Sequence, residues 1–258
     1  MIDSPVRYGP TFKRPSKNSV RKEKRKSGSK MFERDDLIRI LDAAGVQMKA
    51  MILLGCNGGL GNSDTGQLNM EDVDLDAGLI DYPRPKTGVE RRVPLWAETI
   101  EAIKASLAVR TEPKDEVNAD LVFVTKRGGP WHVDDPRSPF SHEFRKLMQR
   151  IDHEAEVEAT KNGTEPPDKL YVARRGFYAL RHTFRTIADE SRDFPAIDRV
   201  MGHSDNTMGG HYRERIDDTR LRAVVDHVHD WLYADPDGGD GKEPAEEPKV
   251  HSHLRVVG

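Results

Sequence analysis

The segment from residue 177 to residue 212, FYALRHTFRTIADESRDFPAIDRVMGHSDNTMGGHY, constrains the fold of this chain most strongly. Apolar residues recur at helical spacing over residues 176–191 and again over 195–201, and a Gly202-His203 turn follows. The segment also concentrates cationic and aromatic polar side chains: Arg181, His182, Arg185, His203, His211 and Tyr212. Two helices and a turn can bring such guanidinium, imidazole and phenol groups together, and these groups suit a site that handles phosphate.

The rest of the chain predicts a fold of class α+β, mainly α, with a small antiparallel β-sheet. Apolar periodicity predicts further helices over residues 32–44, 46–56, 62–68, 96–107, 140–151 and 217–233. Strands are expected at 79–82, 91–95 and 121–124, and the first two form a hairpin with Arg84 and Lys86 at its tip. The charged, proline-containing stretch 154–168 is predicted to be a loop. These elements make one domain over residues 31–234.

The two ends of the chain carry opposite charge. Residues 1–30 hold ten Lys and Arg side chains against two acidic ones, whereas residues 235–258 hold six acidic side chains against three basic ones. Both ends are rich in polar residues and poor in periodic apolar positions, which predicts disorder. We therefore expect a basic arm over residues 1–30 that binds a polyanion and an acidic tail over 235–258; a solubilising arm without a partner is the alternative.

Composition favours a soluble protein of the reducing cytoplasm. The longest apolar run, MILLGC, is far too short to cross a bilayer, and the basic N-terminus lacks the apolar core of a secretory signal. The single cysteine, Cys56, lies in that apolar run and cannot form an internal disulfide, so a buried, inert thiol is expected. The sequence contains no cluster of Cys and His residues that would predict a zinc site. His227 and His229 are two residues apart on a predicted helix and so point in different directions, and His251 and His253 lie in the tail.

Several motifs occur in an order that identifies a family. They are LNMEDVDLDAGLI, PKTGVERRVPL, LVFVTKRGGP, ALRHTF, VMGHSDNTM and HY, and eight residues separate His203 from Tyr212. Together they resemble the catalytic domain of tyrosine recombinases, the phage integrase family, over about residues 32–233. Each motif alone is weak, but their shared order makes the resemblance specific.

The resemblance implies a site-specific recombinase or integrase that cleaves and rejoins DNA through a 3′-phosphotyrosine intermediate. It implies that Tyr212 is the nucleophile, Arg181 a phosphate clamp, Lys86 the general acid and His203 a hydrogen-bonding or proton-handling partner. The residue types suit this chemistry, since a phenol with an ordinary pKa of about 10 needs help to lose its proton and a pentacoordinate phosphate favours guanidinium groups. No metal or other cofactor is required.

The chain departs from the family pattern at two positions. Tyr178 occupies the place of the histidine in the family's His-x-x-Arg motif; it can donate a hydrogen bond to phosphate but cannot be a cationic proton donor. Gly61 stands where the family's first arginine is expected, and Asp64 where its glutamate is expected. Loss of one charge-stabilising donor typically slows a reaction about 10²–10³-fold. Arg84 is a candidate replacement, and the backbone N–H groups of residues 59–62 are another.

Other basic residues are expected to contact duplex DNA. They are Arg84, Lys126 and Arg127 in turns, and Lys22 and Arg25 in the basic arm. The arm is too short to form the N-terminal helical domain that the resemblance implies, and we expect it to replace part of that domain's contact with phosphates. His182 and Arg185 are interpreted as packing or backbone-contact residues.

Alternatives remain open from sequence alone. Tyr212 and Lys86 could be ordinary surface residues, and His203 could cap a helix. The chain could be a catalytically impaired integrase-like DNA-binding protein that occupies recombination sites, or a type IB topoisomerase. A homo-oligomer on DNA is expected, and the helix at 217–233 either docks on a neighbouring protomer or packs on its own domain.

Overall fold

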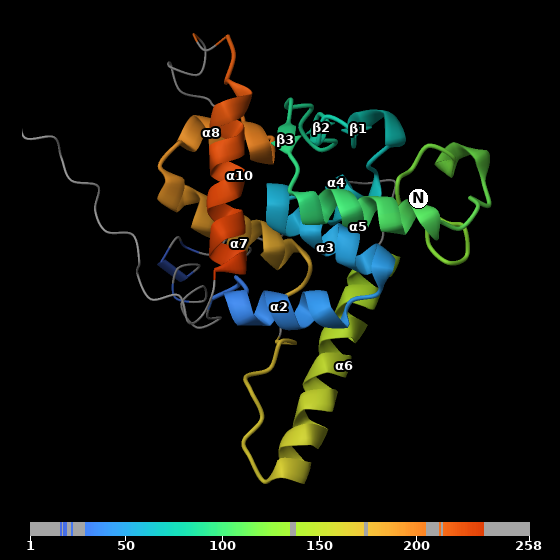
Figure 1. Ribbon diagram of the computed structural model, residues 1–258, viewed down its shortest axis with the longest axis vertical. Helices are drawn as coiled ribbons and strands as arrows, with labels where there is room; N and C mark the ends of the chain where they lie inside the picture. Colours follow the sequence, from blue (N-terminus) through green and yellow to red (C-terminus); the bar gives the residue numbers. More distant parts are fainter. Residues whose placement is uncertain are drawn as a thin grey trace, which may run out of the picture.

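The structure, a computed structural model, describes residues 29–134, 138–172, 175–204 and 214–234, together with residues 16, 18, 19, 22 and 212. Its helices include α2 (Arg34–Ala43), α3 (Val46–Gly58), α4 (Asn62–Gly66), α5 (Ala97–Ala108), α6 (Pro139–Asn162), α7 (Tyr178–Ala188), α8 (Phe194–Met201) and α10 (Asp218–Tyr233), with 3₁₀ turns η1 (Met70–Asp72), η2 (Glu116–Asn118) and η3 (Asp189–Ser191). The helices surround α3, and a small sheet lies at one end of the domain (Figure 1). The predicted class, α+β and mainly α, is confirmed.

The sheet has three short antiparallel strands in the order β1-β2-β3. They are β1 (Val73–Asp74), β2 (Leu79–Asp81) and β3 (Arg92–Pro94). Ile80 of β2 pairs with Val93 of β3, and both side chains are buried. The sheet therefore presents one apolar face to the helices, and its second hairpin is the predicted one.

The β2–β3 hairpin continues past its strands toward the tip. The N–H of Tyr82 donates to the carbonyl of Arg91 at 3.1 Å, and the N–H of Arg84 donates to the carbonyl of Val89 at 2.8 Å. The tip turns at Gly88, whose φ of 65° is a left-handed conformation that glycine adopts without steric cost. Backbone pairing thus holds Arg84 and Arg91 on the ordered part of the hairpin rather than in a free loop.

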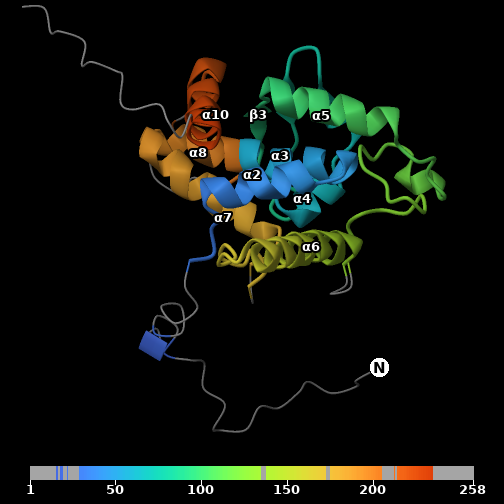
Figure 2. The same cartoon turned by 60° about the horizontal axis from the view of Figure 1, so that its bottom comes forward.

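Helix α3 forms the centre of the core because it is apolar on every side. It packs against α5 and α7, and Figure 2 shows it between them. At its C-terminal end the buried Asn57 donates from Nδ2 to the carbonyl of Pro94 at 2.9 Å and accepts from the N–H of Trp96 at 2.9 Å. This one amide side chain therefore fixes the end of the hairpin to the core.

Helices α7 and α8 carry the segment that constrained the sequence most. Leu180, Phe184 and Ile187 bury one face of α7. The side chain of Asp193 caps α8 by accepting from the N–H of Ala196 at 3.2 Å, and α8 ends at Gly202 with a φ of 62°. Both helices and the Gly-His turn are as predicted.

Helix α10 packs on its own domain. Its buried apolar stripe consists of Leu221, Val224, Val225, Val228 and Leu232, and it contacts α3, α7, α8 and β3. The indole N–H of Trp96 donates to the carbonyl of Val225 at 2.9 Å, which fixes the helix to the start of α5. Of the two alternatives left open for this helix, the described contacts are those of packing within the domain.

The predicted loop over residues 154–168 is wrong for its first half. Helix α6 continues to Asn162 and ends at Gly163, whose φ is 67°. The segment after residue 151 is rich in Glu and Ala, which favour helix even without an apolar face, and Arg150 pairs with Glu154 one turn later at 3.3 Å. High charge without an apolar face therefore does not distinguish a loop from an exposed helix. Figure 1 shows the C-terminal half of α6 projecting from the domain.

The predicted strand over residues 121–124 is also wrong. Leu121 and Val124 each make only an isolated bridge, with Asn69 and with Pro130. Val122 is buried and its N–H donates to the carbonyl of Leu68 at 2.8 Å. The apolar run is therefore a core segment whose backbone bonds go to loops and not to a ladder.

In the part of the chain that the structure describes, no helix is both long enough and apolar enough to cross a membrane.

The glycine at the end of α8 yields a stability prediction. A Cβ at Gly202 would lie 3.1 Å from Arg84 Cβ and from Arg91 Nε, in addition to the left-handed φ. Gly202→Ala should lower the free energy of unfolding by about 2–3 kcal/mol, measured by urea denaturation. Gly163→Ala is the matched control, because its φ is 67° and no atom lies within 4 Å of the added Cβ; it should cost only about 1 kcal/mol. Equal losses would show that Gly202 is not crowded.

Candidate active site

Arg181 lies at the centre of the site and is almost completely buried. It projects from the first turn of α7, and its guanidinium donates to the carbonyl of Gly59 at 2.6 Å and to the carbonyl of Met201 at 2.8 Å. A third contact, 2.6 Å long, joins its Nη2 to Nε2 of His203. The side chain therefore links the end of α3 to the end of α8. Its role as a phosphate clamp, which the resemblance implies, stays a prediction.

Asp64 is the carboxylate around which three guanidinium groups gather. Its oxygens lie 3.1 Å from Nη2 of Arg91, 3.8 Å from Nε of Arg84 and 3.8 Å from Nη1 of Arg181. The N–H of Gly61 also donates to Asp64 Oδ2 at 2.9 Å. Burial by itself raises the pKa of this carboxyl, but Arg91, the Gly61 hydrogen bond and the other two arginines together hold the pKa below its usual value.

The cluster of Asp64, Arg84, Arg91 and Arg181, called the arginine cluster below, has more positive than negative charge. Nε and Nη1 of Arg91 and Nε of Arg84 are buried and have no hydrogen-bond partner among the described residues. Burial, and then the charges of Arg84 and Arg91, lower the pKa of Arg181 to about 10, so it stays charged at neutral pH. A buried cluster of this kind favours an anionic ligand, and phosphate geometry matches guanidinium donors.

His203 is oriented on both sides of its ring. Nε2 faces Arg181, which can only donate, and Nδ1 lies 3.4 Å from Oδ1 of Asp198. This arrangement fits the neutral tautomer with its proton on Nδ1. Burial, followed by the charge of Arg181, lowers the pKa of His203, and Asp198 opposes that shift.

Of the two residues interpreted as packing or backbone-contact residues, His182 packs against a neighbouring ring as expected, whereas Arg185 forms two ion pairs. Arg185 Nη1 pairs with Asp198 at 2.6 Å, while its Nε pairs with Asp189 at 2.7 Å, so Arg185 holds the carboxylate that orients His203. The His182 ring packs edge-on against Tyr178, with ring centroids 5.5 Å apart.

Tyr178 and Gly61 are neighbours in space. Tyr178 is 50% exposed at the start of α7. A Cβ at Gly61 would lie 3.4 Å both from Cδ2 of Tyr178 and from Oδ2 of Asp64. Both positions that depart from the family pattern therefore lie at the edge of the arginine cluster.

The remaining predicted site residues are exposed. Lys86 projects from the hairpin tip, and Tyr212 is 79% exposed; neither makes a hydrogen bond or ion pair with another residue that the structure describes. Lys126 and Arg127 occupy an exposed turn closed by the N–H of Thr125 donating to the carbonyl of Gly129 at 2.8 Å. The structure thus brings Arg181, His203 and Arg84 together, and leaves Lys86 and Tyr212 outside that contact network.

Of the two predicted residues in the basic arm, Lys22 is exposed and Arg25 lies outside the described residues. His211, next to Tyr212, also lies outside them.

Sequence reasoning missed Arg91 and Asp198. Arg91, Val93 and Leu95 alternate along the hairpin strand and are all buried, so the two-residue period of a strand gave a signal that Arg91 points inward. Asp198 lies partly buried on the short helix α8, next to Arg199, and no local pattern distinguishes it.

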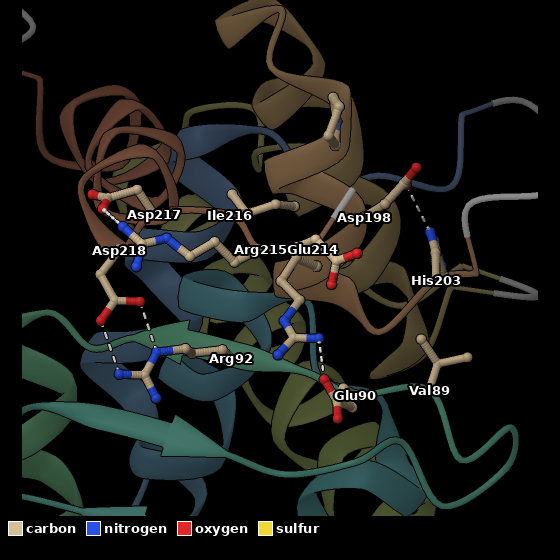
Figure 3. A pocket seen from close by; sticks show the side chains of 12 residues that line it. Val89, Glu90, Arg92, Asp198, His203, Glu214, Arg215, Ile216, Asp217 and Asp218 are labelled. Atoms are coloured by element: carbon tan, nitrogen blue, oxygen red, sulfur yellow. Dashed lines mark hydrogen bonds and ion pairs between the residues drawn. The ribbon is translucent and has the colours of Figure 1, made fainter. Parts of the chain in front are cut away.

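A hollow of about 490 Å³ lies beside His203 (Figure 3). It is lined by carboxylates and arginines from the hairpin, α8 and residues 214–218: Glu90, Asp198, Glu214, Asp217 and Asp218, with Arg92, Arg199 and Arg215. Arg199 pairs with Glu90 at 2.6 Å, and Arg92 with Asp218 at 2.7 Å. Since carboxylates outnumber arginines here, the arginine cluster is the better anion site.

The chain is similar to known recombinases. A family model described as the phage integrase family matches residues 30–218. The chain is 29% identical over 181 residues to tyrosine recombinase XerC of Actinobacillus pleuropneumoniae serotype 7 (strain AP76), covering 70% of this chain and 51% of that protein. Type 1 fimbriae regulatory protein FimE of Escherichia coli (strain K12) is 27% identical over 163 residues, covering 62% and 71%. The crystal structure of XerA recombinase superimposes with a TM-score of 0.52 at 19% identity, over 76% of this chain and 64% of that one.

The fold is that of a tyrosine recombinase catalytic domain. Because the family model matches most of the chain, the protein belongs to the phage integrase family. The chain spans 46–60% of the length of the XerC and XerD recombinases that it matches.

The environment of His203 predicts a titration below the ordinary range. Its Cε1 proton, assigned with His203→Gln, should titrate in NMR with a pKa below about 6.5. Asp198→Asn should lower the pKa further because it removes the opposing charge. Because the pKa is lower in the folded state, the unfolded chain binds a proton at higher pH than the folded chain does. The free energy of unfolding should therefore decrease as pH falls below about 6.5. A pKa above 6.5 would contradict the geometry.

Proposed function

We propose that the protein is a site-specific DNA recombinase or integrase that cleaves and rejoins duplex DNA through a 3′-phosphotyrosine intermediate. The observation that carries the proposal is the buried arginine cluster, in which Arg181 contacts His203 and faces unpartnered guanidinium donors. Membership of the phage integrase family and the names of its XerC relatives support it.

In the proposed cleavage, the hydroxyl oxygen of Tyr212 attacks a DNA phosphorus. A new oxygen–phosphorus bond forms, and the bond from phosphorus to the 5′-oxygen breaks. The phenol proton passes to His203 and Lys86 protonates the leaving oxygen, so the charge and protons balance. Rejoining reverses each step with a 5′-hydroxyl as the nucleophile.

The residues around Arg181 suit these roles. When phosphate enters, Arg181 can transfer its Nη2 hydrogen bond from His203 to a phosphate oxygen, which frees the Nε2 lone pair to accept the phenol proton. Asp198 stabilises the imidazolium that forms. Tyr178, half exposed beside the cluster, donates a hydrogen bond to phosphate.

The proposed partner is duplex DNA in the cytoplasm, bound by a homo-oligomer. Lys86, Lys126 and Arg127 are exposed and can contact the DNA backbone. Sedimentation with and without a duplex tests assembly, and a monomer in both cases would exclude it.

Nicked suicide duplexes made from the ends of the gene's own mobile element test cleavage. The wild type should form a covalent protein–DNA adduct, and Tyr212→Phe should form none because it lacks the attacking oxygen. Arg181→Ala should slow adduct formation about 10²–10³-fold or more. Tyr171→Phe, which alters another exposed tyrosine, should react as the wild type does. Adduct formation by Tyr212→Phe would refute the assigned nucleophile.

Gly61 favours a second candidate, an impaired DNA-binding relative that occupies recombination sites. It predicts salt-sensitive duplex binding that survives Tyr212→Phe, with no adduct from the wild type on the same duplexes. An adduct from the wild type would eliminate this candidate.

The basic arm should contribute sequence-independent affinity. Replacing both Lys22 and Arg25 with Ala should weaken binding to any duplex and reduce the slope of log K against log salt by about 1.8, since each phosphate contact contributes about 0.9. Fluorescence anisotropy across a salt series measures this. Replacing Lys104 and Lys146, exposed helix residues in local ion pairs, is the charge-matched control. An unchanged slope would indicate that the arm does not touch DNA.

A further inference from the structure

The β2–β3 hairpin delivers two arginines to the carboxylate beside Gly61. Arg84 and Arg91 come from the two sides of the hairpin tip, and both reach Asp64, at 3.8 and 3.1 Å. Gly61 lies at the N-terminal end of α4, and its own N–H donates to the same carboxylate. A residue without a side chain is thus surrounded by guanidinium groups that originate elsewhere in the chain.

A side chain at position 61 would start next to the Asp64 carboxylate. The backbone there, with φ −89° and ψ −179°, is extended and accepts any residue. The added Cβ would lie in ordinary contact, 3.4 Å, with Asp64 Oδ2 and with the Tyr178 ring. An arginine starting at this point would meet the carboxylate that the hairpin arginines already hold.

The two hairpin arginines differ in what they can reach. The Arg91 side chain is fully buried, lies over the Tyr82 ring at 6.0 Å, and its Nη2 donates to the carbonyl of Met201 at 3.4 Å. The Arg84 side chain is 15% exposed and donates no hydrogen bond to any residue that the structure describes. Arg91 therefore anchors Asp64, whereas Arg84 has donors available to a ligand at the surface of the cluster.

Gly202 makes this approach possible. A Cβ there would lie 3.1 Å from both Arg84 Cβ and Arg91 Nε, so a side chain at this turn would push the hairpin arginines away by a few tenths of an ångström. Arg84 and Arg181 both lie 3.8 Å from Asp64, and Arg181 contacts His203 at 2.6 Å, so the three side chains converge on one site.

We propose that Arg84 supplies the second phosphate-binding guanidinium, which position 61 lacks, and that Arg91 is the positioning residue that holds Asp64 beneath it. This inference rests on the proposed function, because it places Arg84 opposite Arg181 on the scissile phosphate. The ligand is a phosphodiester, or any tetrahedral phosphate of similar charge. The hairpin then provides both Arg84 and the general acid Lys86 to the same phosphate group.

Substitution and rescue at position 61 test the replacement on the suicide duplexes described above. Arg84→Ala should slow adduct formation about 10²–10³-fold. Adding Gly61→Arg to Arg84→Ala should recover at least tenfold, because the new guanidinium reaches the same carboxylate. Adding Gly61→Arg to Arg181→Ala should recover nothing. A rate for Arg84→Ala within threefold of the wild type, or a tenfold gain from Gly61→Arg alone, would overturn the proposal.

A phosphate-binding measurement tests whether Arg84 binds phosphate, independently of DNA cleavage. If the wild type forms no adduct, the proposed function fails, but this measurement still decides the role of Arg84. In inorganic phosphate at about ten times its Kd, the Tm of the full chain should rise by roughly 3–6 °C over chloride of equal ionic strength. Arg84→Ala and Arg181→Ala should lose this rise, while Tyr212→Phe and Lys104→Ala should keep it. No rise in the wild type, or an undiminished rise in Arg84→Ala, would refute Arg84 as a phosphate ligand.

The role of Arg91 needs a readout beyond stability. Arg91→Met should fold with a lower Tm in chloride and lose most of the phosphate-induced rise, because Asp64 is then free to pair with Arg84. Arg91→Lys, which keeps a charge near Asp64, should recover part of the phosphate-induced rise. A lower Tm with an unchanged phosphate response would make Arg91 purely structural. If Arg84→Ala does not fold, Arg84→Gln, which keeps most of the side-chain volume, replaces it in both experiments.

Discussion

The ion pairing between Asp64 and three arginines governs how this site is built. A buried charge is costly unless it is paired, and removing one partner leaves an uncompensated charge whose cost is about 3–5 kcal/mol. Here the carboxylate lies within 4 Å of Arg84, Arg91 and Arg181, so any one guanidinium shares its countercharge with two others. Three guanidinium groups and one carboxylate leave an excess of positive charge, and the phosphodiester proposed as ligand would add one negative charge that reduces it. The proposed phosphate affinity and the cost of the empty cluster are therefore two consequences of the same charge imbalance.

Elements that lie far apart in the chain meet at the arginine cluster. Helix α7 provides Arg181, the start of α4 provides Asp64, and the hairpin provides Arg84 and Arg91. The buried Asn57 fixes the end of the hairpin to α3, and Gly202 lets the hairpin approach the turn after α8. Because these contacts involve backbone atoms or a missing side chain, they fix the position of the hairpin relative to α3 and α8 closely. The same contacts set the distance between the arginine cluster and His203.

Sequence alone located the residues whose roles depend on short-range patterns. Arg181 and His203 belong to motifs in a helix and a helix end, and the structure places them 2.6 Å apart. The helix around 217–233 and the hairpin followed from apolar periodicity of 3.6 and 2 residues. Residues 154–162 are helical although the sequence predicts a loop, because an exposed helix rich in Glu and Ala has no apolar stripe to detect. Residues 121–124 do not form the predicted strand, because an apolar run can be buried without a neighbouring strand to pair with.

Arg91 and Asp198 show why the ion-pair partners in the remaining part of the site could not be predicted from the sequence, even where strand periodicity indicates that Arg91 points inward. Their functions come from partners more than ten residues away: Asp64 for Arg91, and Arg185 for Asp198. A charged residue in a strand is ordinarily expected to face solvent, and only tertiary packing shows which charges find buried partners. The absence of an arginine at position 61 is visible in the sequence, whereas the compensation that we propose is a property of the folded hairpin. A substitution that removes a side chain from a catalytic motif therefore does not by itself indicate a silent enzyme, since the same charge can reach the same carboxylate from a different element.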